Sequence, residues 1–209
     1  MIRNFKTLGL LLGALLVLGV ATAPTAVAVP QFTASSYPAT MTGSTLNDRL
    51  FTEAGSVECS VHYSATLSGA SSTLTLTTST SLCSAFGFIS ATVNPEGCTD
   101  VLHATNQVGT GLYESHVDIV CPAGNSIKIS AGTCKMEIKG QNGLTTMNSV
   151  NNAGTIWFLT EMTGITYVVT QDGFACPFFG TGTKFGGERT GGEVNLSRVG
   201  GGEIGVSGS

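Results

Sequence analysis

Residues 98–121 read CTDVLHATNQVGTGLYESHVDIVC, with a cysteine at each end and turn-forming residues in the middle. Both flanks have the composition of β-strands, and Gly109-Thr110-Gly111 predicts a turn between them. The simplest interpretation is a long antiparallel hairpin whose two ends are joined by a disulfide bond between Cys98 and Cys121. We expect the rest of an all-β protein to be organised around this hairpin.

A disulfide between the ends of the hairpin fixes its register. Asp100 then faces Ile119 and Leu102 faces Val117, and successive side chains point to opposite faces of the hairpin. One face is apolar enough to point inward, and it carries Cys98, Leu102, Ala104, Val117, Ile119 and Cys121. Asp100 is the one polar misfit on this inward face.

The opposite face carries the most chemically specific residues of the chain. His103 lies directly opposite His116 there, and Glu114 and Asp118 share the same face. Directly opposed Cβ atoms are about 5 Å apart, close enough for both imidazoles to bind one zinc or copper ion with an added carboxylate. The alternative is a solvated outer face that carries these four residues without a metal.

Residues 1–28 have the three parts of a secretory signal peptide. Arg3 and Lys6 give a positive start, 8–20 is an uncharged apolar run, and Ala26-Val27-Ala28 is a cleavage site of small residues. Cleavage would leave one domain, 29–209, that is secreted or held in the cell envelope. An uncleaved anchor is the alternative, but the apolar run is short for a membrane span, and none is expected after cleavage.

Charge excludes some partners. Removing Arg3 and Lys6 lowers the count of basic residues from 9 to 7, against 13 acidic ones. An acidic chain without a basic cluster argues against nucleic acid as a partner. It argues equally against an anionic membrane surface.

Six cysteines behind an export signal predict three disulfides, and six cysteines allow 15 connectivities. Zinc ligation by these cysteines is not favoured, because their spacing contains no C-x-x-C. The preferred pairs are two that close hairpin-sized loops and a third by elimination: Cys59–Cys83, Cys98–Cys121 and Cys134–Cys176.

Short alternating segments separated by turn residues follow one another along the mature chain, without a helical period. They predict an antiparallel β-sandwich of roughly ten or more strands stapled by disulfides, with a β-barrel as the alternative. The apolar residues change from odd to even positions at Gly132-Thr133, which predicts a β-bulge there. Thr163-Gly164 predicts a turn. The ends 29–56 and 181–209 are interpreted as partly loose segments or short strands.

The most apolar loop contains Phe174, Phe178 and Phe179. These rings could form an exposed patch that binds a partner. The interpretation that we favour is that this loop, like Phe86 and Phe88, plugs the end of the core.

Several short motifs resemble a group of uncharacterised secreted β-rich proteins of high-GC Gram-positive bacteria, which have no assigned function. They are Tyr-Pro-Ala-Thr at 37–40, Cys-Ser-Ala-Phe-Gly at 83–87, Gly97-Cys98 and Val-Asp-Ile-Val-Cys-Pro-Ala-Gly at 117–124. The resemblance spans about 37–180, and it implies a bacterial, extracytoplasmic setting without lending an activity.

Catalytic motifs do not stand out in the sequence. It has no G-x-S-x-G, no phosphate-binding loop and no cysteine in a catalytic context. We therefore expect a non-catalytic β-domain with a binding or structural role, whose partner is an unknown extracellular ligand or envelope component. The alternatives are a metal-binding protein or enzyme that uses His103 and His116, and a secreted protease inhibitor.

Overall fold

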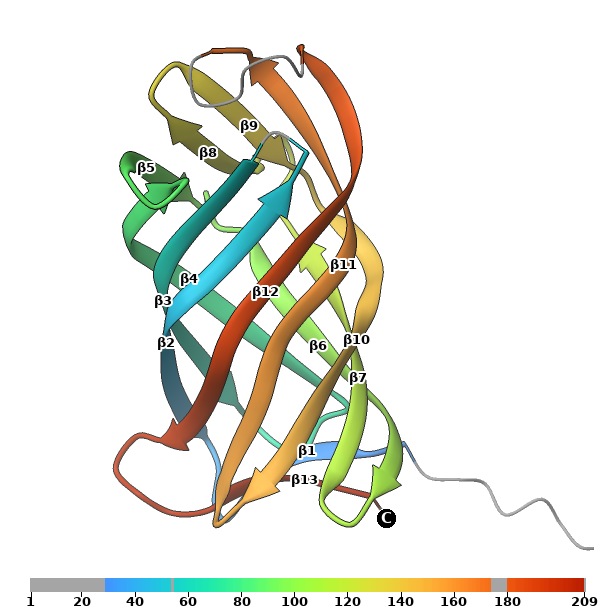
Figure 1. The fold of residues 1–209 in the computed structure, drawn as a ribbon. Helices are drawn as coiled ribbons and strands as arrows, with labels where there is room; N and C mark the ends of the chain where they lie inside the picture. Colours follow the sequence, from blue (N-terminus) through green and yellow to red (C-terminus); the bar gives the residue numbers. More distant parts are fainter. Residues whose placement is uncertain (1–28, 54, 174–179, 209) are drawn as a thin grey trace, which may run out of the picture.

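The computed structural model describes residues 29–53, 55–173 and 180–208, which form strands, turns and loops without a helix. The predicted all-β fold is confirmed (Figure 1). Among these residues there is no helix with the length and apolar character needed to cross a membrane. The strands, in chain order, are β1 (Gln31–Ala34), β2 (Ala39–Thr52), β3 (Gly55–Leu67), β4 (Thr73–Ala85), β5 (Ile89–Asn94), β6 (Thr99–Gly109), β7 (Leu112–Val120), β8 (Ile127–Ala131), β9 (Cys134–Ile138), β10 (Gln141–Asn152), β11 (Thr155–Gln171), β12 (Gly182–Arg198) and β13 (Ile204–Ser207).

One antiparallel sheet of eleven strands makes up most of the molecule. Hydrogen-bonded neighbours follow the order β10-β7-β6-β4-β3-β2-β12-β11-β9-β8-β5. In addition, β10 pairs with β11 and β4 pairs with β5, so both ends of the sheet return to strands within it. The sheet therefore curls into a barrel-like body around a single core (Figure 1).

The wall β11-β12-β2-β3-β4 is shared by two groups of partner strands. The first residues of β4 pair with β6, whereas Ser84 and Ala85 at its end pair with β5. Likewise, the start of β11 pairs with β10 and its end pairs with β9. One group, β6, β7 and β10, thus completes the wall towards one end of the body, and the other group, β5, β8 and β9, completes it towards the other.

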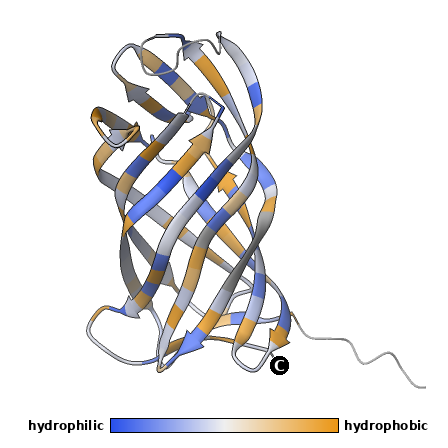
Figure 2. Cartoon of the chain, viewed as in Figure 1, coloured by the Kyte–Doolittle hydropathy of each residue, from blue (hydrophilic) through white to orange (hydrophobic). Residues whose placement is uncertain are grey.

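Alternation along the strands separates the inside of this body from its surface. In β3, every second residue from Val57 to Leu67 is buried, and the residues between them are half-buried or exposed. Figure 2 shows the same alternation of hydrophobic and hydrophilic residues along the other strands. Most of the core is thus built from one face of the curled main sheet, as the period of two predicts.

A small second sheet lies across one end of the body. It consists of β1 and β13, with Gln31 opposite Ser207 and Ala34 opposite Ile204. Phe32 is fully buried in the core cluster, and its backbone exchanges hydrogen bonds with Ser71. The start and the end of the described chain are therefore neighbours at this end.

Two of the three predicted disulfides are confirmed. Cys59 is bonded to Cys83 and Cys98 to Cys121. Cys134 is disulfide-bonded as well, and its expected partner Cys176 lies outside the described residues. The hairpin register set by the second bond is also confirmed, with Asp100 opposite Ile119 and Leu102 opposite Val117.

Two local predictions were wrong, and they were wrong in opposite senses. Gly132-Thr133 is not a bulge but a two-residue turn, which places Ala131 opposite Cys134 and gives Gly132 a φ of 56°. Thr163-Gly164 is not a turn, because β11 continues through it with a register shift between Met162 and Ile165. A turn and a bulge can look the same in the sequence, because both contain a glycine and both shift the apolar residues from odd to even positions. The position of the neighbouring strand decides which of the two forms.

The two segments interpreted as partly loose or as short strands each supply a short strand of the small sheet, β1 or β13, and a long strand of the main sheet. Fourteen-residue β2 and seventeen-residue β12 pair with each other and stand in the shared wall. A glycine-dense sequence at 181–209 therefore does not prevent a long strand when both neighbours supply hydrogen-bond partners.

Removal of one hairpin disulfide tests how much these cross-links stabilise the fold. Cys98→Ala/Cys121→Ala opens a loop with a sequence separation of 23 residues. The chain-entropy estimate for a loop of this length predicts a loss of about 3 kcal/mol in the free energy of unfolding, measured by urea titration. Cys59→Ala/Cys83→Ala, with a separation of 24, should lose a similar amount. An unchanged urea midpoint in both variants would contradict the assigned role of the bonds.

Candidate functional site

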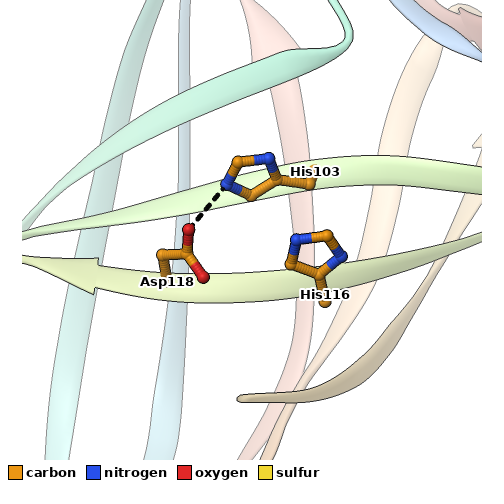
Figure 3. A group of neighbouring side chains, drawn as sticks. All are labelled: His103, His116 and Asp118. Carbon is orange, nitrogen blue, oxygen red and sulfur yellow. Dashed lines mark ion pairs between the residues drawn. The ribbon is translucent and has the colours of Figure 1, made fainter. Parts of the chain in front are cut away.

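The histidine pair lies on the outer face of hairpin β6–β7, where the sequence predicted it. His103 is opposite His116 and Val101 is opposite Asp118. The two imidazole rings are stacked, with centroids 4.4 Å apart and planes at 9° to each other (Figure 3). The common register therefore brings three candidate ligands together.

Asp118 lies beside His103 and is anchored by the backbone of β10. Its Oδ2 lies 2.9 Å from Nε2 of His103, and its Oδ1 accepts a hydrogen bond of 2.7 Å from the backbone N–H of Gly143 on β10. The side chains are only partly solvated, at 30% exposure for His103 and 17% for Asp118. The carboxylate is therefore fixed by its own support, a common feature of carboxylates that bind metals.

Nε2 of His103 is enclosed, yet it has no aligned hydrogen-bond partner in the described part of the chain. The oxygen of Asp118 is near in distance but does not meet the direction that a hydrogen bond requires. The contact is therefore weak, because the strength of a hydrogen bond falls steeply with misalignment. This nitrogen can therefore accept a cation.

One ligand atom from each of His103, His116 and Asp118 lies within 4.8 Å of the other two. Ligand atoms on a tetrahedral zinc ion, with bonds near 2.0–2.2 Å, are about 3.4 Å apart. Because the two imidazole rings are nearly parallel, their nitrogen lone pairs do not converge on one point. Binding of one ion therefore requires one imidazole to rotate toward the other two ligands. The cluster supplies the ligand types for zinc or copper, and side-chain rotation would complete the geometry.

Glu114 does not join this cluster. A register shift follows Ala104, so that Glu114 is opposite Asn106 and its Oε2 accepts a hydrogen bond from the Asn106 amide at 3.4 Å. The prediction of Glu114 as a ligand assumed an unbroken hairpin register. His62, the third histidine, is exposed on β3 and belongs to a different part of the wall.

The aromatic loop residues Phe174, Phe178 and Phe179 lie outside the described residues. The second loop that was expected to plug the core does not do so, because Phe86 and Phe88 are 43% and 77% exposed. The loop directly follows the disulfide-bonded Cys83 at the end of β4.

A buried charged cluster was missed by the sequence analysis. Arg189 of β12 binds Asp48 of β2 through Nε and Nη2, at 2.9 and 2.7 Å, and Asp100 through Nη1 at 2.8 Å. Tyr63 donates a hydrogen bond of 2.6 Å to Asp48 and accepts one of 2.8 Å from Arg189. The polar misfit Asp100 on an apolar face was the signal that could have indicated such a partner.

A β-bulge explains how Asp48 reaches the interior. The register between β2 and β3 shifts between Thr45 and Asp48, and both of these residues are 6% exposed. Without the extra residue, Asp48 would point to the surface, because side chains alternate along a strand.

Charge and burial act against each other in this cluster. Burial raises the pKa of Tyr63 well above its ordinary value. Burial by itself lowers the pKa of Arg189, but the combined attraction of Asp48, Tyr63 and Asp100 outweighs burial and holds that pKa well above the ordinary value. Arg189 is therefore a permanent cation between two carboxylates.

Comparison with known proteins finds no match among family models, curated proteins or solved structures.

Replacing Arg189 tests the structural role of the charged cluster. Arg189→Met leaves Asp48 and Asp100 buried without their cation, which should lower the free energy of unfolding by about 3–5 kcal/mol. Arg49→Met is the matched control, because Arg49 pairs with Glu58 at the surface and is half exposed, so that a loss below about 1 kcal/mol is expected. If urea titration gives Arg189→Met and Arg49→Met the same loss in free energy of unfolding, the buried cluster does not stabilise the fold more than a surface ion pair does.

Proposed function

We propose that this protein is a non-catalytic, extracytoplasmic β-domain that binds one zinc or copper ion through His103, His116 and Asp118. The observation that carries the proposal is the convergence of three ligand atoms within 4.8 Å, with the carboxylate already anchored to Gly143. Imidazole and carboxylate are ligands that both ions accept.

An extracytoplasmic location is supported by two independent features. Disulfide bonds persist in oxidising compartments, and the described residues contain two of them. The sequence of 1–28 has the organisation of a secretory signal peptide. The resemblance to secreted proteins of high-GC Gram-positive bacteria favours release to, or retention in, a bacterial envelope.

A metal-dependent enzyme is the second candidate. Three protein ligands leave one position of a tetrahedral zinc ion open to water, as in catalytic zinc sites. A binding role is preferred because Glu114, the other carboxylate that the hairpin carries on this face, accepts a hydrogen bond from Asn106 and does not join the cluster as a general base.

Metal titration tests the site directly. Calorimetry of the purified protein with Zn²⁺ and with Cu²⁺ should give one ion per chain. His103→Ala and His116→Ala should abolish binding, and Asp118→Asn, which keeps an oxygen for the Gly143 N–H, should weaken it by roughly tenfold or more. His62→Ala is the matched control, because it removes an exposed histidine elsewhere and should bind like the wild type.

Acidification provides a second readout of the same site. Protons compete with the metal for the imidazole nitrogens, so affinity should fall as the pH is lowered. Heat of binding that survives in both histidine variants would refute the site.

Export can be tested separately from metal binding. Expression of the full chain in a Gram-positive host should release a protein whose first residue, by mass spectrometry, is Val29. A protein that stays in the cytoplasm with residues 1–28 attached would contradict the proposed location.

A further inference from the structure

A cavity of ≈ 70 Å³ lies inside the body, where the two groups of partner strands meet. Its walls are largely aliphatic and come from both groups, with Val93 on β5, Ile119 on β7, Ile129 on β8 and Ile138 on β9. Since one buried water needs about 10–15 Å³, the cavity has room for about five waters or an organic molecule with a similar number of heavy atoms.

One end of this cavity is charged. Asp48, Asp100 and Arg189 all line it, and the two carboxylates outnumber the one guanidinium. Both aspartates are almost fully buried, at 6% and 4% exposure. Because an uncompensated charge is unfavourable in an apolar interior, the cavity favours a cationic guest over a neutral or anionic one.

The two carboxylates are not equally occupied. Asp48 accepts hydrogen bonds from Nε and Nη2 of Arg189 and from the hydroxyl of Tyr63. Asp100 accepts one hydrogen bond among the described residues, at Oδ2 from Nη1 of Arg189. A carboxylate has about four acceptor positions, so Asp100 retains capacity for a donor.

We propose that the cavity binds a small primary alkylammonium ion, with its ammonium group on Asp100 and its alkyl chain among the isoleucines. The ammonium group brings a positive charge and three donors, which match the excess carboxylate. The short chain matches the volume and the aliphatic wall. A metal ion fits less well, because the remaining lining offers few oxygen or nitrogen ligands.

This site is independent of the proposed metal site. Asp100 and His103 lie on the same strand, but alternation places Asp100 inside and His103 outside. Arg189, at the polar end of the cavity, keeps 16% of its side chain exposed. A variant that loses metal binding should therefore still bind a guest in the cavity, and the reverse should also hold.

The probe for the test is n-butylammonium chloride, added to the purified protein and followed by methyl NMR. Saturable shifts are expected for the methyl groups of Ile119, Ile129 and Ile138. n-Butanol, which has the same chain without the charge, should bind more weakly by roughly tenfold or more, because hydrogen bonds to charged groups are stronger. Sodium chloride at equal ionic strength should leave these methyl groups unshifted.

Two variants separate the charge from the cavity. Asp100→Asn keeps an oxygen for Arg189 but removes the charge, and it should weaken butylammonium binding by roughly tenfold or more. Val93→Phe fills the cavity from a half-buried edge position and should abolish binding without changing either carboxylate. His103→Ala is the matched control and should bind butylammonium like the wild type.

The wild-type titration alone can overturn the proposal. Absence of saturable shifts, or equal affinity for butanol and butylammonium, would show a water-filled or merely apolar cavity. Unchanged binding in Asp100→Asn would exclude the carboxylate as the anchor. Failure of these tests leaves the zinc and copper titration unaffected, so the two proposals can fail separately.

Discussion

The disulfide bond between Cys98 and Cys121 holds hairpin β6–β7 in one register, and this register decides which side chains share a face. With Cys98 at one end and Cys121 at the other, His103 meets His116 on the outside while Asp100 points into the core. A slip by one residue would exchange the two faces, because side chains alternate along a strand. Both clusters of chemically specific residues therefore depend on the same cross-linked pairing.

Much of this arrangement could be predicted from the sequence, because it is local. Two cysteines, a turn and alternating residues within 24 positions are enough to place His103 opposite His116. The same reasoning failed for Glu114, since a bulge after Ala104 changes the register and the composition of the hairpin does not mark it. Local patterns thus predict pairings well up to the first irregularity.

The interior cluster could not be assembled in the same way. Asp100 was recognisable as a misfit, but its partner Arg189 lies 89 residues further along the chain, on a strand whose glycines resemble a loop. Asp48 faces inward because of a bulge in β2 that only the neighbouring strand reveals. The wrong predictions of a bulge at Gly132 and of a turn at Gly164 have the same origin. Pairing with neighbouring strands decides whether a glycine ends a strand or bends it.

The small sheet of β1 and β13 has a topological consequence. It places Gln31 opposite Ser207, and Asn151 of β10 fixes it with hydrogen bonds to the backbone of Val206. The first and last strands of the described residues thus lie side by side, so that the break between them is incidental to the order of the strands. Any surface turn of the sheet would be an equivalent place to begin the chain, and the order of neighbouring strands would remain the same.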